Sequence, residues 1–153
     1  ENAPIDLNDV DPKWLKETLD KAGIRWRVIV ISACYSGSFV PALQDDNTLI
    51  ITASAADRAS FGCSNEADYT YFGRAFFDQA MREQTSVSAA FEQAKATVAQ
   101  WESAQGFEAS EPQWSIGKNM EFMLPQLEQR LFPVVSKTDS KAVETPQLSV
   151  QTQ

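Results

Sequence analysis

Two short apolar runs, at about 27–32 and 48–53, constrain the fold of this chain more than any other feature. The first contains the residues VIVI and the second reads TLIITA, so neither alternates apolar with polar side chains. Continuous runs of this kind, rich in β-branched residues, are typical of strands buried on both faces of a parallel sheet. Both runs therefore predict strands that have neighbours on either side.

Segments with helical spacing lie before, between and after the two runs. The pair Asp11-Pro12 supplies an N-cap and a first helical residue, and Gly23 ends this helix. The spacing of apolar residues predicts further helices at 36–43, 69–83, 86–105 and from Met120 to Leu131, the last one kinked at Pro125. Strands that alternate with helices predict an α/β fold with a mostly parallel sheet flanked by helices.

The sequence indicates fewer strands than two fully buried strands require. Only one further strand is indicated, in the segment PQWSIG at 112–117. Two strands buried on both faces need more neighbours, so we expect an incomplete sheet whose early strands are missing. We expect one domain over residues 1–132 and, from its content of Ser, Thr, Gln and Lys, a flexible tail over residues 133–153.

Charge and cysteine content argue against several classes of function. The 153 residues include 13 Lys and Arg against 21 Asp and Glu, a formal net charge of −8. This balance is opposite to the basic surface of a nucleic-acid-binding protein and disfavours anionic membranes. Neither of the two cysteines has a Cys or His at metal-ligand spacing, so we expect no metal and no cofactor. No signal peptide or membrane span is predicted, and cytoplasm and cell envelope both stay open as compartments.

Cys34 lies just after the first predicted strand, where open parallel sheets bind their ligands. A helix is expected to begin a few residues later, and a helix N-terminus favours the reactive thiolate. The backbone N–H of Cys34 would be available to an oxyanion. Gly37 and the small Ser36 and Ser38 would let a substrate backbone approach closely.

Two interpretations of Cys34 stay open on the residues alone. A nucleophilic cysteine usually needs a base, and the chain contains no histidine. Free cysteine is also among the most buried residue types, so Cys34 could equally be an inert core residue beside a strand.

Two segments resemble the legumain-type cysteine peptidases, the asparaginyl endopeptidases, which share a fold with caspases. The first is SACYSG at 32–37, directly after VIVI, and the second is TASAADRASFGCSNEADYTYFG at 52–73. The resemblance covers roughly Val28 to Phe77 and extends loosely to the segment SEPQWSIG. It implies that the chain is the C-terminal portion of a caspase-like domain.

The resemblance also implies a mechanism. Cys34 would attack the scissile carbonyl and form a thioester acyl-enzyme, and its N–H would supply half of the oxyanion hole. In this family an upstream His-Gly pair supplies the general base and the second oxyanion donor. Only 33 residues precede Cys34 here and none of them is His. We therefore expect the base to lie outside this chain, and the chain alone to be inactive or nearly so.

The substrate pocket implied by the resemblance comprises Ser32, Ser60 and Arg74. Ser60 fits the family, whereas Ser32 and Arg74 stand where the family has acids. An arginine in place of an acid removes the reason to expect a preference for asparagine. Arg74 could favour an acidic substrate residue or could turn outward, and Glu66 or Asp68 could replace the missing acid.

The function expected is that of a cysteine endopeptidase acting on peptides or proteins. A transamidase of the same family would share the acyl-enzyme and resolve it with an amine instead of water. The alternative from another class is a catalytically inactive caspase-like module that binds peptides or partners. An incomplete sheet exposes a strand edge, so self-association through that edge is also expected.

Overall fold

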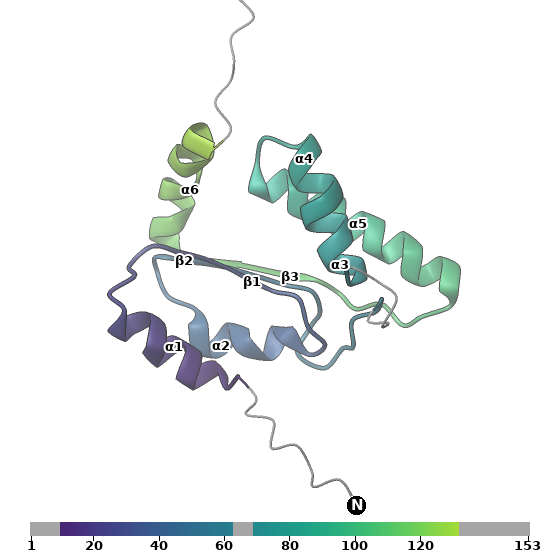
Figure 1. The fold of residues 1–153 in the computed structure, drawn as a ribbon, viewed down its shortest axis with the longest axis horizontal. Coiled ribbons are helices and arrows are strands. Elements are labelled where there is room, and N and C mark those ends of the chain that lie inside the picture. The colour runs from purple at the N-terminus through teal and green to yellow at the C-terminus, as the bar shows by residue number, and fades with distance from the viewer. Residues whose placement is uncertain (1–9, 63–68, 132–153) are drawn as a thin grey trace, which may run out of the picture.

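A computed structural model describes residues 10–62 and 69–131 of the chain (Figure 1). The predicted tail over residues 133–153 and the alternative acids Glu66 and Asp68 lie outside these described residues. The helices and strands, in chain order, are α1 (Pro12–Lys21), β1 (Arg27–Ile31), a 3₁₀ helix (Ser36–Phe39), α2 (Val40–Leu43), β2 (Thr48–Thr52), α3 (Tyr71–Gly73), a π-helical segment (Arg74–Ala80), α4 (Met81–Glu83), α5 (Val87–Gln105), β3 (Gln113–Ile116) and α6 (Lys118–Leu131).

The three strands form one mixed sheet in the order β1-β2-β3. β1 runs parallel to β2, with Ile29 opposite Ile50, and β3 runs antiparallel to β2, with Trp114 opposite Ile51. The α/β class is confirmed, and this small sheet flanked by helices is consistent with a partial caspase-like fold. Within the described residues the parallel part of the sheet is the single pair β1-β2.

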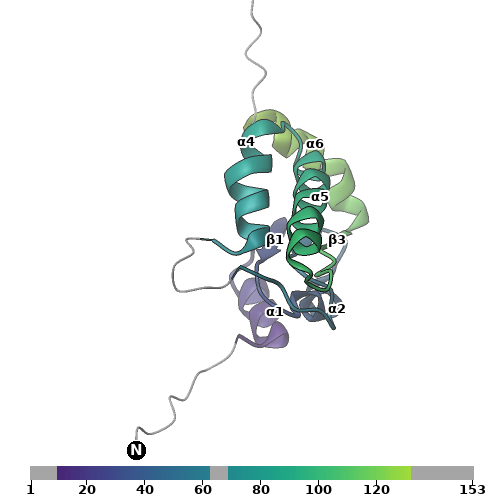
Figure 2. The same ribbon diagram turned by 90° about the vertical axis from the view of Figure 1, so that its right-hand side faces the viewer.

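The helices cover both faces of this sheet. α1 and α2 lie on one face, and α3, α4, α5 and α6 lie on the other (Figures 1 and 2). The main core lies between the second group and the sheet, where Leu49 and Ile51 of β2 belong to the same buried cluster as Phe72, Phe76 and Phe91.

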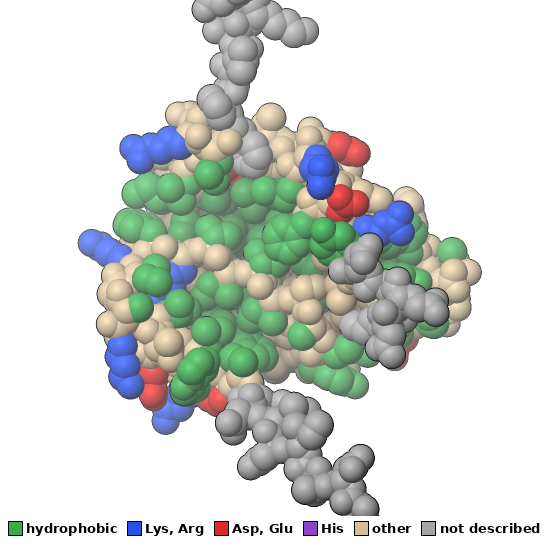
Figure 3. Space-filling view, viewed as in Figure 1, with side chains coloured by type: hydrophobic (Ala, Val, Ile, Leu, Met, Phe, Trp, Pro, Cys, Tyr) green, Lys and Arg blue, Asp and Glu red, His purple; other side chains and the backbone are tan. Residues whose placement is uncertain are grey.

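The burial of the two apolar strands differs. All five residues of β2 are buried, as the sequence predicts for a central strand. In β1 the side chain of Val28 is 47% exposed and the residues after it are only half-buried. β1 forms one edge of the described sheet, which is consistent with the expected incomplete sheet that lacks its early strands. Figure 3 looks onto the molecule from the side of this edge, and hydrophobic side chains gather across the face.

Local capping signals place most helix ends where the sequence predicts them. Asp11 Oδ1 accepts from the N–H groups of Lys13 and Trp14, both at 2.9 Å, and starts α1. Ser86 caps α5, which Gly106 ends in the left-handed region at φ 70°. The predicted helix at 69–83 begins at Tyr71, since Thr70 is its N-cap, and its middle turns are π-helical. α6 continues through Pro125.

An ion pair between α1 and β1 should make stability depend on pH. Arg27 Nη2 donates to Asp20 Oδ1 at 2.6 Å, and this contact, together with Lys16, lowers the pKa of Asp20 below its usual 3.8. A lowered folded-state pKa means that the stabilisation is present above pH 3.8 and is lost as the pH falls through the folded value. We expect Asp20→Asn to lower the urea midpoint at pH 7, with a difference from wild type that shrinks below pH 3.8.

The matched control for this prediction is Glu17→Gln on the same helix, because Glu17 has no ion pair within the described residues. This variant should follow the wild-type curve of urea midpoint against pH. A constant difference between Asp20→Asn and wild type at all pH values would contradict the assignment.

Candidate active site

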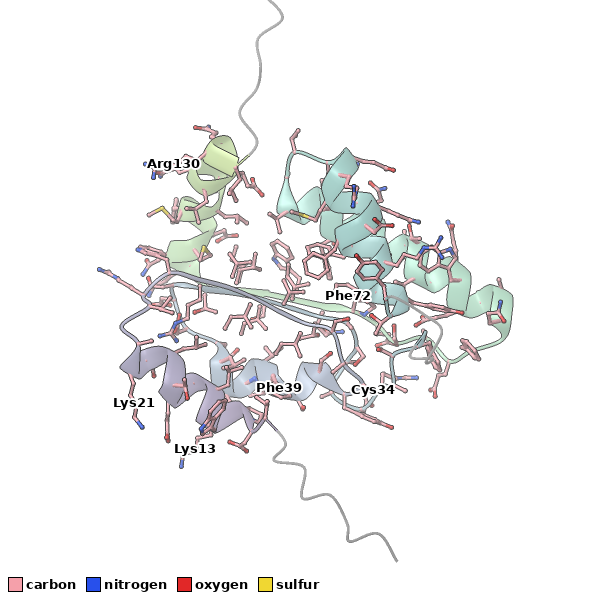
Figure 4. All side chains as sticks on the ribbon, viewed as in Figure 1. Lys13, Lys21, Cys34, Phe39, Phe72 and Arg130 are labelled. Atoms are coloured by element: carbon pink, nitrogen blue, oxygen red, sulfur yellow. The ribbon has the colours of Figure 1, made fainter. Side chains whose placement is uncertain are left out.

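Cys34 lies between the end of β1 and the 3₁₀ helix, and its side chain is exposed (Figure 4). The interpretation of Cys34 as a buried core residue is therefore wrong. Its Sγ contacts the backbone of Ser60 twice: Sγ donates to Ser60 O at 3.2 Å, and Ser60 N–H donates to Sγ at 3.2 Å. These two contacts with the backbone of one residue hold Sγ in place beside Ser60.

A strained turn follows the cysteine directly. Tyr35 has φ 57°, a left-handed conformation that is uncommon for a residue with a Cβ. Its N–H donates to Arg58 O at 2.8 Å, and its carbonyl accepts from Ser38 N at 3.0 Å and Ser38 Oγ at 2.7 Å. These bonds hold the turn on both sides, and the chain reverses immediately after Cys34.

Two buried serines join the chain after β1 to the chain after β2. Ser36 N–H donates to Ser54 Oγ at 3.2 Å, and Ser54 N–H donates to Ser36 Oγ at 3.2 Å. Ser54 Oγ also donates to Ala33 O at 3.2 Å, next to the cysteine. Since both serines are fully buried, this reciprocal pair fixes the segment that carries Cys34 relative to the neighbouring strand.

Gly37 is packed against the same segment of chain after β2. A Cβ at Gly37 would lie 2.6 Å from Ala56 N and 2.7 Å from the carbonyl carbon of Ala55. The expectation that Ser36 and Gly37 leave room for a substrate backbone is therefore wrong: both are buried against the chain's own backbone. Ser38 is exposed, as expected.

The three predicted pocket residues are placed differently. Ser60 is beside Cys34 and 7% exposed, and its Oγ has no hydrogen-bond partner within the described residues. Ser32 is exposed and its Oγ lies 2.8 Å from Oγ1 of Thr70, the N-cap of α3. Arg74 is also exposed, and its guanidinium carbon lies 5.6 Å from the centre of the Trp101 ring on α5. No hydrogen bond or ion pair joins Arg74 to Cys34, Ser32 or Ser60.

Arg58 is a site residue that the sequence does not reveal. Its guanidinium pairs with Glu108 and, at 3.8 Å, with Glu111, and its carbonyl accepts the Tyr35 N–H. The loop that carries Ser60 is thus tied both to the cysteine turn and to the segment before β3. No local pattern marks a partner 50 residues away in the chain. Thr70 could have been found, because a Thr just before a helical segment is an N-cap signal.

We expect loss of the Arg58 ion pairs to reduce the reactivity of the Cys34 thiol. In Arg58→Ala the loop should loosen, and the Ser60 backbone should hold Cys34 Sγ less firmly in place. Because a net hydrogen bond is worth about 0.5–1.5 kcal/mol, a loss of roughly fivefold in alkylation rate is expected. The measurement is the rate of alkylation of Cys34 by iodoacetamide across pH, in a Cys63→Ala background.

Arg82→Ala is the matched control, since Arg82 forms an exposed ion pair with Asp78 at 3.1 Å on the helical segment 74–83. Its alkylation rate should equal that of the parent. Arg58→Lys should recover part of the loss. Equal rates in Arg58→Ala and Arg82→Ala would show that Arg58 does not position the cysteine.

Residues 10–62 and 69–131 contain no group of three His, Cys, Asp or Glu side chains that could hold a metal ion. In the same residues, no helix combines the length and the apolar composition needed to cross a membrane.

Comparison with known proteins identifies the family. No match was found among curated proteins. The family model for the Peptidase C13 family matches residues 2–123, a range that includes Cys34, both segments of the legumain-type resemblance and all three strands. This match covers most of the chain and confirms the resemblance found in the sequence. The chain belongs to the Peptidase C13 family, the legumain family of cysteine peptidases.

Proposed function

We propose that this chain is the nucleophile-bearing part of a cysteine endopeptidase, in which Cys34 forms a thioester with the substrate and a histidine from outside the chain acts as base. The observation that carries the proposal is the exposed Sγ at the carboxyl end of β1, held by the Ser60 backbone, in a chain of the C13 family. Neither metal nor cofactor is needed for this chemistry.

The reaction has two halves. The Cys34 thiolate attacks the scissile carbonyl carbon, and the amine leaves with a proton returned by the base. Water, deprotonated by the same base, then attacks the thioester and releases the carboxylate and the thiol. The Cys34 N–H has no acceptor within the described residues. It could therefore donate to the substrate oxyanion as one half of an oxyanion hole.

The geometry of parallel strands supports a position for the proposed base. The carboxyl ends of parallel strands meet at the same edge of a sheet, so a residue that follows a strand paired to the free side of β1 would lie beside Cys34. That side of β1 has no neighbour in the described sheet, and the chain itself has no histidine. We assign the base to a segment that adds a strand there.

The pocket for the substrate residue before the cut is proposed to include Ser32, Ser60 and Arg74. Ser60 is the best supported, because its buried Oγ lacks a partner within the described residues and its backbone touches Sγ. Arg74 would bind an acidic substrate residue if its guanidinium left the Trp101 ring. The ring contact instead supports an outward orientation, with no preference for acids.

Peptide cleavage tests the proposal. The extended protein, meaning residues 1–153 preceded by the segment encoded before Glu1, is assayed beside residues 1–153 alone. The peptides carry Asn, Asp, Arg or Ala before the cut, and an added amine detects transamidation. We expect cleavage by the extended protein and none by residues 1–153. Preference for Asp would place Arg74 in the pocket.

A second function fits if a folded extended protein cleaves nothing. The lack of a histidine and the contact of Arg74 with Trp101 would then favour a caspase-like module that binds peptides without cutting them. Binding of the same peptides without cleavage, measured by fluorescence anisotropy, would support that module and overturn the peptidase.

A further inference from the structure

The buried face of α5 carries an acidic residue. Val98 and Glu102 follow Ala94 at intervals of four, and Glu102 is only 2% exposed. Helical positions with this spacing face the core, where an apolar residue is expected. Glu102 also lies in the last turn of α5, where the partial negative charge of the helix end disfavours a carboxylate. Its burial and its place in the helix both count against an acid, so a specific contact must favour one.

That contact is with the chain that follows α5. Glu102 Oε2 accepts the backbone N–H of Ser110 at 3.0 Å, and Ser110 is itself 1% exposed. The other oxygen, Oε1, has no hydrogen-bond partner within the described residues. Burying a carboxylate is unfavourable unless it is bonded, and an apolar side chain would fill the same space without that cost. The bond to Ser110 is therefore what an acid contributes at this position.

Residues 107–111, the brace segment, lie between α5 and β3 (Figure 1). Three contacts join this segment to the loop at 55–61, which carries Ser60. They are the hydrogen bond from Ala55 N–H to Ser110 O at 2.9 Å, the ion pairs of Arg58 with Glu108 and, at 3.8 Å, with Glu111, and the stacked rings of Phe61 and Phe107, whose centroids are 4.4 Å apart. The position of the loop therefore depends on the position of the brace segment.

The brace segment ends in a strained turn. Glu111 has φ 55°, a left-handed conformation that is uncommon for a residue with a Cβ. Such a conformation costs free energy and persists only where neighbouring contacts hold it. The bond between Glu102 and Ser110 holds the residue directly before Glu111. Without this bond we expect the brace segment to relax and its contacts with the loop to weaken.

A run of backbone hydrogen bonds continues from the loop to the cysteine turn. Ala55 O accepts the N–H of Arg58 at 3.3 Å, and Arg58 O accepts the N–H of Tyr35 at 2.8 Å. Tyr35 directly follows Cys34 in the chain. Ser60, two residues beyond Arg58, forms both contacts with Cys34 Sγ. A displacement of the loop would therefore change how the thiol is held.

We propose that Glu102 is a positioning residue for Cys34. Through Ser110 it fixes the brace segment, and the brace segment holds the loop after β2 against Sγ. Glu102 acts through these contacts, and none of its described hydrogen bonds is to Cys34. Its importance for catalysis rests on the proposed function. The placement of Sγ itself can be measured without any peptide cleavage.

The rate of alkylation of Cys34 by iodoacetamide, in a Cys63→Ala background, tests the proposal. Glu102→Met fills a similar space but offers no oxygen to the Ser110 N–H, and it should slow alkylation about fivefold. Glu102→Gln keeps an acceptor oxygen and should react at close to the parent rate. Val98→Ala is the matched control, one turn earlier on the same buried face. It should lower the urea midpoint without slowing alkylation.

A double variant tests the route from Glu102 to the cysteine. Arg58→Ala and Glu102→Met both release the loop from the brace segment. Combined, they should slow alkylation by less than the product of their separate effects, because changes within one set of contacts are not additive. Separate effects that multiply in full would contradict a shared route.

Amide hydrogen exchange keeps the proposal testable where Glu102→Met does not fold. In the unmodified protein, the N–H groups of Ser110, Ala55 and Tyr35 should exchange with one common opening free energy, because the contacts described above couple them. Glu102→Gln should leave this common value in place. Exchange of Tyr35 far faster than that of Ser110 would show that the cysteine turn opens without the brace segment, and would overturn the proposal.

The variants can also overturn the proposal. Equal slowing of alkylation in Val98→Ala and Glu102→Met would show only a general effect of lost stability. An unchanged rate in Glu102→Met, or a loss in Glu102→Gln as large as in Glu102→Met, would contradict the role of the acceptor oxygen. None of these readouts uses peptide cleavage, so failure of the positioning role can be told apart from failure of the proposed peptidase.

Discussion

Replacing Cys34 with alanine is expected to abolish peptide hydrolysis by the extended protein, with a loss of at least about 10⁴-fold in kcat/KM. The alanine variant should keep the fold, because Cys34 is exposed and the hydrogen bonds of its Sγ within the described residues are to the Ser60 backbone. It removes the Sγ atom that is proposed to form the thioester. The measurement is kcat/KM for the best peptide of the Asn, Asp, Arg and Ala set.

Cys63→Ala is the matched control for this prediction, because Cys63 is the other cysteine of the chain. It should retain activity close to that of the parent. Circular dichroism should show the same thermal unfolding for both variants. Hydrolysis that survives in Cys34→Ala would remove Cys34 from the mechanism.

Replacing Gly37 with alanine is expected to have a large effect on stability. The added Cβ would lie 2.6 Å from Ala56 N and 2.9 Å from Ser54 O, and backbone atoms cannot swing aside as a side-chain end can. Overpacking of this kind costs about 1–3 kcal/mol, and we expect the upper part of that range. The free energy of unfolding in urea measures it.

Gly23→Ala separates steric overlap from the general cost of replacing a glycine. Gly23 has φ 70° and nothing within 4 Å of its Cβ position, so its variant should lose only about 1 kcal/mol through backbone strain. Because Gly37 lies in the segment that carries Cys34, Gly37→Ala should also slow the alkylation of Cys34, and Gly23→Ala should not. Equal losses of stability in both variants would show that the segment around Gly37 shifts to accommodate a Cβ more easily than its contacts indicate.

The parts of the fold that depend on nearby residues could be predicted from the sequence. Asp11, Ser86 and Gly106 act within a turn of the helix ends that they mark, so their effect is visible in a short stretch of sequence. The apolar run of β2 predicts a buried strand correctly. β1 also contains a continuous apolar run, but its burial depends on whether a neighbouring strand is present, which the run itself does not encode.

Part of the candidate site could likewise be predicted from the sequence, and part could not. The position of Cys34 after a strand and before a helical turn is a local feature, and the sequence predicts it. The bonds that fix it join residues far apart: Ser36 to Ser54, and Arg58 to Glu108. Such pairs form only when the strands are already packed, and serine or arginine alone indicates no partner. Ser60 was found through the family resemblance, not through any physical pattern in the chain.

The central claim is that Cys34 carries the acyl group and that its base comes from outside residues 1–153. The most direct measurement is intact-mass and peptide-mass analysis of the extended protein, quenched in acid during turnover of a peptide ester. We predict an acyl adduct on Cys34 that hydroxylamine removes, and no such adduct on residues 1–153 alone under the same conditions. Turnover without an adduct on Cys34, or an adduct formed equally fast by residues 1–153, would contradict this account.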